Sequence, residues 1–181
     1  MNFKINVYLT DKDYMDYNVF WMTKSAYGKK QMVGYRIFIA VFIAALCALS
    51  LAYREDGVSA FVPIVAYLAV LVLFQIFLVP ILVGGVKGTF KLLKKQGKMG
   101  YSPNSEMEFF EDCFVEITPE AKTEQKYLAI ERISVIGEKV VYVHVNNVAA
   151  YILPNSCFAS TEQYDEFMRF IRTKCQNVDV Y

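Results

Sequence analysis

The sequence predicts a protein in two parts, a membrane α-helical hairpin and a small α+β domain. Two uncharged apolar stretches predict the hairpin, one from Ile37 to Ala52 and one from Val58 to Val86. A soluble helix keeps a polar face, and neither stretch has one. Short segments of alternating polarity after residue 105, ending in an amphipathic helix, predict the second part. The hydrophobic fraction, 55%, exceeds the usual soluble range of about 45–50% because of these two stretches.

Both apolar stretches are long enough to span a bilayer. The first reaches about 20 residues once the snorkelling Arg36 and the two residues before it are counted. As a straight helix the second would measure about 43 Å, more than the roughly 30 Å of hydrocarbon. We therefore expect it to tilt, to kink at Pro63 or Pro80, or to enter the headgroup region at Gly84. The predicted spans are 35–53 and 58–86, joined by a tight turn at 53–57.

Two features of the hairpin concern helix packing. Gln75 is the only strongly polar side chain of the second span, and we expect it to hydrogen-bond across the helix pair. Ala40, Ala44 and Ala48 recur every four residues, so we expect this small-residue face to pack against the second span. The same face could instead pack against another copy of the chain, so a homo-oligomer formed through the hairpin is an open alternative.

Basic residues flank the hairpin on both outer sides. Residues 1–36 carry six basic and three acidic side chains, whereas the turn carries one arginine and two acids. A lysine cluster without any acid follows the second span: Lys87, Lys91, Lys94, Lys95 and Lys98. The positive-inside rule then predicts two spans with both termini in the cytoplasm. The lysine cluster is the predicted membrane-surface contact, at about 1 kcal/mol per lysine on an anionic leaflet, or else it only determines topology.

The chain is expected to fall into four parts. These are a strand and aromatic helix (1–34), the transmembrane hairpin (35–86), a basic juxtamembrane segment and linker (87–104), and the cytoplasmic α+β domain (105–181). Thr10 or Asp11 is expected to cap the N-terminal helix. That helix packs on the cytoplasmic domain, continues into the first span, or lies among the headgroups. Whether the N-terminal strand, 3–9, joins the C-terminal sheet is left open.

Residues 105–181 show the periodicity of strands followed by a helix. The expected strands are 107–110, 114–118, one or two within 126–136, 139–145 and 148–153. The predicted turns are Glu111-Asp112, Gly137-Glu138 and Asn146-Asn147. Ser160 and Gln163 fit a capping box, and the helix after them places Phe167 and Ile171 on one stripe. This order predicts a curled sheet or small β-barrel with the C-terminal helix closing one end.

The arrangement is similar to that of a known family. Ile130, Ile133 and Ile136 are spaced three apart, and YVHV, a strand ending in YILP and a capped helix follow. Two spans and a basic stretch precede these strands, and the chain begins with a strand followed by Thr10, Asp13 and Tyr14. The whole pattern resembles the YcxB-like family of bacterial membrane proteins.

The resemblance carries expectations about fold, location and chemistry. It implies that the cytoplasmic part is like a bacterial pleckstrin-homology (PH) domain. It also implies a location in the bacterial inner membrane, and it transfers no catalytic residue. Ile130 stands where a tryptophan is common in the family, and Asn155 stands where a basic residue often follows the proline.

No group of residues predicts catalysis, a cofactor or a metal ion. His144 is the only histidine, so a metal site or a serine–histidine pair lacks partners, and we expect a satisfied or surface histidine. The four cysteines form no C-x-x-C and are expected to be reduced. A dense group of carboxylates is expected to form a solvated face: Glu106, Glu108, Glu111, Asp112 and Glu116. Residues 99–181 carry 13 acids and 7 bases, which argues against nucleic-acid binding.

The sequence therefore favours a membrane-anchored adaptor rather than an enzyme. The hairpin would hold a small cytoplasmic domain that binds a protein segment or a lipid headgroup at the inner leaflet. An open strand edge, or the groove beside the C-terminal helix, is the expected binding surface. The acidic charge of the domain favours a basic peptide over an anionic headgroup. The alternative is an oligomeric membrane pore or a membrane enzyme of unrecognised type.

Overall fold

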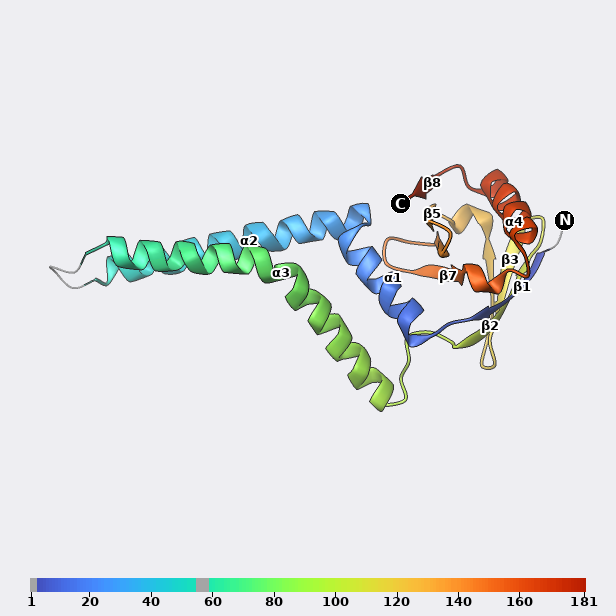
Figure 1. The fold of residues 1–181 in the computed structure, drawn as a ribbon, viewed down its shortest axis with the longest axis horizontal. Helices are drawn as coiled ribbons and strands as arrows, with labels where there is room; N and C mark the ends of the chain where they lie inside the picture. Colours follow the sequence, from blue (N-terminus) through green and yellow to red (C-terminus); the bar gives the residue numbers. More distant parts are fainter. Residues whose placement is uncertain (1–2, 55–58) are drawn as a thin grey trace. The chain divides into compact units, whose positions relative to one another are not determined.

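The computed structural model describes residues 3–54 and 59–181, and the chain divides into two compact units. The sheet unit comprises 1–18 and 97–181 and contains every described strand, and the hairpin unit comprises 19–96 (Figure 1). Most of the predicted turn at 53–57, and the first residue of the predicted second span, lie outside the described residues.

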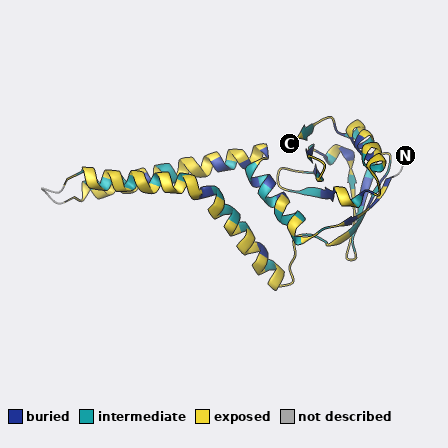
Figure 2. Cartoon of the chain, in the orientation of Figure 1, coloured by how far each residue is buried: buried dark blue, intermediate teal, exposed yellow. Residues whose placement is uncertain are grey.

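Two long helices make up most of the hairpin unit. α2 (Ala26–Ala52) and α3 (Phe61–Lys95) are long and apolar enough to cross a membrane. α2 begins before the predicted first span, and α3 continues past the end of the predicted second span. The core helix of a soluble domain is mostly buried, whereas only 11% of the most apolar window of α2 and 6% of that of α3 are buried (Figure 2). These two helices support the prediction of a membrane protein.

α3 carries Pro80, a predicted kink position, and Gln75, the predicted hydrogen-bonding side chain. Pro80 lies inside the helix, where it cannot donate the usual backbone hydrogen bond. α3 changes direction part-way along its length, as a proline in a helix interior predicts (Figure 1). Gln75 donates from Nε2 to the carbonyl oxygen of Arg36 at 3.3 Å, which confirms the hydrogen bond expected between the two helices.

The alanine face of α2 is not the contact between the two long helices. Ile43 is buried and Ala40 is half-buried, whereas Ala44 and Ala48 are exposed. A buried hydrophobic cluster joins Met32 of α2 to Leu78 of α3. Large side chains fill the space between the helices, so the prediction that the small-residue face packs inside the hairpin is wrong.

The chain bends sharply between α1 (Asp11–Thr23) and α2. The buried Ser25 donates from Oγ to the carbonyl oxygen of Trp21 at 2.5 Å and accepts from the backbone N–H of Gly28 at 2.9 Å. A Cβ on Gly28 would lie 2.7 Å from the carbonyl oxygen of Met22, and closer still to that of Trp21. Only glycine therefore fits this close approach, and α1 does not continue straight into the first span.

The sheet unit contains two four-stranded sheets. The first is antiparallel in the order β1 (Phe3–Tyr8), β2 (Asn104–Phe109), β3 (Cys113–Ile117), β4 (Lys122–Lys126). The second has the order β7 (Ala150–Pro154), β6 (Val140–His144), β5 (Arg132–Ile136), β8 (Val178–Val180), with β8 parallel to β5. The two sheets do not pair into a closed barrel among the described residues.

The N-terminal strand belongs to the first sheet, which answers the question the sequence left open. β1 pairs antiparallel with β2, in a register that places Ile5 opposite Met107. The structure differs from the predicted strands in the 126–136 segment, where Tyr127–Ala129 form a short 3-10 helix between β4 and β5. β8 at the C-terminus was not predicted.

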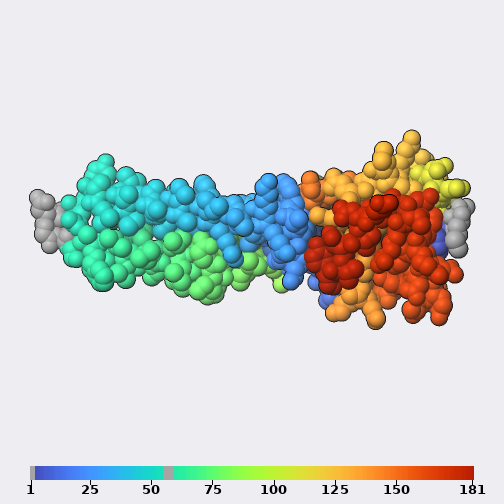
Figure 3. All heavy atoms as spheres, turned by 90° about the horizontal axis from the view of Figure 1, so that it is seen from above, coloured from blue at the N-terminus to red at the C-terminus, as the bar shows by residue number. Residues whose placement is uncertain are grey.

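The C-terminal helix α4 (Thr161–Lys174) packs on the core of the sheet unit. Ser160 caps it by accepting from the backbone N–H of Gln163 at 3.3 Å, as predicted, and the Gln163 amide oxygen accepts from the backbone N–H of Ala159 at 2.6 Å. Phe167 and Ile171 are fully buried on the predicted stripe. In the space-filling view the C-terminal residues cover one face of the sheet unit (Figure 3).

Candidate functional site

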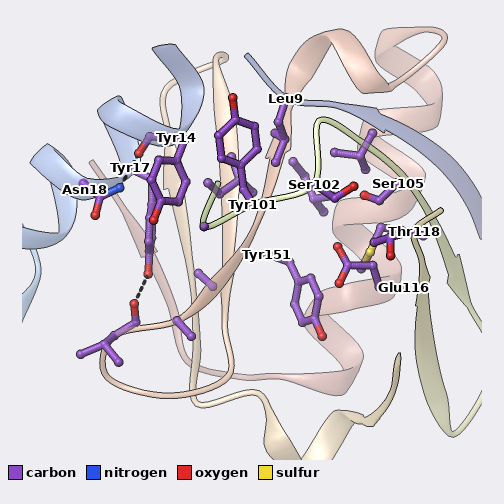
Figure 4. A pocket seen from close by; sticks show the side chains of 18 residues that line it. Leu9, Tyr14, Tyr17, Asn18, Tyr101, Ser102, Ser105, Glu116, Thr118 and Tyr151 are labelled. Carbon is purple, nitrogen blue, oxygen red and sulfur yellow. Dashed lines mark hydrogen bonds between the residues drawn. The ribbon is translucent and has the colours of Figure 1, made fainter. Parts of the chain in front are cut away.

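A cavity of about 340 Å³ opens in the sheet unit. One wall is the inner face of the first sheet, another is α1, and a third is the segment that leads into β7 (Figure 4). The labelled lining residues are Leu9, Tyr14, Tyr17, Asn18, Tyr101, Ser102, Ser105, Glu116, Thr118 and Tyr151. Beside apolar side chains, the described residues of the lining therefore include four tyrosines, three small hydroxyl side chains and one carboxylate.

The edge of strand β7 borders this cavity. Four consecutive residues of the strand, 150–153, line it, and Val148 and Ala149 of the preceding turn line it as well. The backbone N–H groups of these two turn residues already donate to Asn146, so only the strand residues contribute a free edge. The face of a strand would contribute only alternate residues, so consecutive residues indicate that the strand presents its edge. β7 pairs with β6 alone, so its other edge has no hydrogen-bonded strand in the described sheets, although β1 comes close to β7. Such an edge offers backbone N–H and C=O groups to a ligand.

The tyrosines are held in place by contacts around the cavity. Tyr14 stacks on Tyr101 with ring centroids 4.9 Å apart, and the Tyr101 hydroxyl donates to Asp11 at 2.8 Å. The Tyr17 hydroxyl donates to the carbonyl oxygen of Val148 at 3.1 Å. Burial raises the pKa of both Tyr17 and Tyr101 to about 12, and the bond to Asp11 adds to the effect at Tyr101. Both rings are therefore neutral at pH 7.

Among the described residues that line the cavity, Glu116 is the only carboxylate. In the strand register it lies opposite Met107, and Phe109 lies opposite Phe114 on the same face. Met107, Phe109 and Phe114 are all buried in the core, so Glu116 occupies a position on the inner face of the sheet. Burial raises the pKa of the Glu116 carboxyl, and the Ser105 hydroxyl, which favours the charged form, offsets part of this rise.

The structure corrects the prediction of one solvated carboxylate face. Glu106 and Glu108 do lie on the outer face of β2, where Lys4 forms salt bridges to them at 2.6 and 3.6 Å. Glu116 lies on the opposite face, inside. The inward position of Glu116 could not be predicted from the sequence, because the consecutive apolar residues Phe114 and Val115 do not indicate which of the two faces the core.

His144 lies in a buried layer near the cavity. It is fully buried, which excludes the surface position, and its Nε2 lies 3.1 Å from Oγ of Ser134. Tyr17 packs over the same strand, with its ring centroid 6.1 Å from that of His144. Burial, and then the charge of Arg132, lower the pKa of His144 to about 4, so it is neutral at pH 7. In the described part of the chain no three metal-ligating side chains come together.

The lysine cluster lies at the end of α3 and just beyond it. Lys87, Lys91, Lys94 and Lys95 belong to the final turns of the helix, and all four are exposed. Lys98 follows Gly97, whose positive φ of 70° ends the helical course. Membrane contact by the lysine cluster stays a prediction.

Comparison with known families supports the resemblance seen in the sequence. Residues 109–171 match the family model of the YcxB-like proteins. The resemblance to YcxB-like proteins is confirmed. The matched YcxB-like region begins at the end of β2 and reaches into α4. It therefore includes Glu116 and the β7 edge, while β1, α1 and the hairpin unit lie outside it.

No curated protein and no solved structure matches the chain significantly.

Proposed function

We propose that this YcxB-like chain is a membrane-anchored binding module of the bacterial inner membrane. In this proposal α2 and α3 span the membrane and both termini lie in the cytoplasm. The sheet unit, a PH-like domain with an open sheet arrangement, binds a segment of a partner protein there. The lysine cluster contacts the anionic leaflet separately from this binding.

The observation that carries the proposal is the cavity beside the free edge of β7. An extended peptide can add to an exposed strand edge through backbone hydrogen bonds, while a pocket beside the strand receives one of its side chains. Residues 150–153 of β7 supply the edge, and the tyrosine-lined cavity supplies the pocket. The basic flanks of the hairpin support the membrane topology.

Affinity capture from the host organism tests this proposal. The full-length protein is solubilised in detergent and compared with an Ala149→Trp variant, in which the large ring fills the cavity. Ala121→Trp is the matched control, because Ala121 is exposed and does not line the cavity. We expect one partner to be held by the wild type and by Ala121→Trp, and to be lost from Ala149→Trp. A partner retained by all three variants would place binding elsewhere and would overturn the proposal.

A further inference from the structure

Glu116 is an acidic residue at a core-facing position of a strand. Its cross-strand neighbour Met107 is 1% exposed, and its same-face neighbour Phe114 is fully buried. Glu116 itself is half-buried, because its side chain borders the cavity, so its carboxylate loses part of its hydration unless a charge or hydrogen-bond donors satisfy it. Ser105 and Thr118, which line the same wall, supply hydroxyl groups but no positive charge.

No cation of the described chain neutralises Glu116. The salt bridges among residues 3–54 and 59–181 involve other carboxylates. Lys4, for example, pairs on the outer face of the sheet with Glu106 and Glu108. Glu116 thus lacks the lysine partner that Glu106 and Glu108 have on the outer face. Its charge faces a cavity that is open to a ligand (Figure 4).

The rest of the cavity wall suits an organic cation. Tyr151 lies beside Glu116 in the close view, and Tyr14, Tyr17 and Tyr101 line the same space (Figure 4). Neutral tyrosine rings attract an ammonium or guanidinium group through their π-faces. An anionic phosphate would instead meet the like charge of Glu116, so a phosphate-bearing headgroup does not fit this cavity.

We infer that Glu116 receives the lysine or arginine side chain of a protein segment bound along the β7 edge. This inference rests on the proposed function and names the kind of side chain for which the binding site is specific. The backbone of the segment pairs with β7, and one basic side chain of the segment enters the cavity. There the cation forms a charge-assisted hydrogen bond with the Glu116 carboxylate and contacts the tyrosine rings.

A peptide library tests the inference on the full-length protein in detergent micelles. The peptides have ten residues, each position is varied in turn, and both ends are blocked so that only side chains carry charge. Glu116→Gln removes the charge at nearly constant shape. Glu108→Gln is the matched control, because it removes the same charge from the outer face of the neighbouring strand. The melting temperature of Glu116→Gln should equal or exceed that of the wild type, since an amide is less costly to bury than a carboxylate.

We expect one peptide position at which lysine or arginine binds at least about tenfold better than glutamine. That preference should persist in Glu108→Gln and fall below about twofold in Glu116→Gln, which should still bind the same peptides weakly. If the wild type binds peptides without a basic preference, the inference is overturned and the proposed function stands. If it binds no peptide, or only vesicles with an ethanolamine headgroup, the proposed protein partner and the inference both fail.

Discussion

Replacing Phe167 by alanine tests whether α4 holds together the unit that contains the cavity. The Phe167 ring is fully buried. Its centroid lies 5.0 Å from that of Phe109, 5.3 Å from that of Phe158 and 6.1 Å from that of Phe3. These rings come from the first sheet and from the segment before α4. Phe167 is therefore a junction between the helix and the sheet beneath it.

The expected loss of stability follows from this burial. Truncating a buried phenylalanine to alanine costs about 3–5 kcal/mol. Each aromatic pair adds about 0.5–1.5 kcal/mol beyond burial, although neighbouring pairs are not additive. We therefore expect Phe167→Ala to lower the free energy of unfolding by about 4–5 kcal/mol. Phe170→Ala is the comparison, because Phe170 is only partly buried, although its ring contacts Phe3 and Tyr127, and it should cost less, about 2 kcal/mol.

Urea titration of the full-length protein in detergent micelles, followed by brief proteolysis, measures unfolding of the sheet unit. With a urea dependence of about 2 kcal/mol per molar, Phe167→Ala should lower the midpoint by about 2 M. The reasoning fails if Phe167→Ala and Phe170→Ala lower the midpoint equally. That result would mean that α4 does not pack on the sheet through Phe167.

Three further outcomes follow from other parts of the chain. Gly28→Ala should destabilise the bend between α1 and α2 by at least about 2 kcal/mol, whereas Gly34→Ala, with open space around it, should not. Thermal unfolding in detergent measures both variants, and equal melting temperatures would contradict the importance of the bend. Because the pKa of His144 is lowered to about 4 in the folded state, the unfolded chain takes up a proton first as the pH falls below about 6.5. Stability should therefore fall between pH 6.5 and 4, by up to about 3 kcal/mol, and His144→Gln should flatten that slope in urea titrations. Changing the whole lysine cluster to glutamine should invert the orientation of part of the protein population in the membrane. In a variant without its native cysteines and with Tyr181→Cys, the inverted molecules should then react with an impermeant maleimide in intact cells. If Tyr181→Cys stays protected, the N-terminal flank alone determines topology.

The sequence predicts the elements whose physical signal is local. The hairpin follows from two stretches without a polar face, and Gln75 bonds across the helix pair as a lone amide in an apolar helix is expected to do. The capping box at Ser160 and the buried stripe of α4 are equally local. In each of these cases residues within a few positions determine the structure.

Features that depend on distant segments could not be read from the sequence. The inward position of Glu116 depends on its register with β2, and the β7 edge is free only because of the order of strands in the sheet. The packing of α2 through Ile43 instead of Ala44 depends on the partner helix. The cavity itself combines α1, β1 and segments near residues 100 and 150, and no local pattern indicates that they meet.

Photo-crosslinking in the host organism tests whether the sheet unit holds a partner at the β7 side of the cavity. A photoreactive residue replaces Val148, which is 59% exposed and lines the cavity, or Leu128, which is 97% exposed and does not line it. We predict a protein adduct in the membrane fraction with the probe at Val148 and none with the probe at Leu128. An adduct only with the probe at Leu128, equal adducts at both positions, or an adduct at neither would contradict the account of a membrane-anchored module that binds its partner at this cavity.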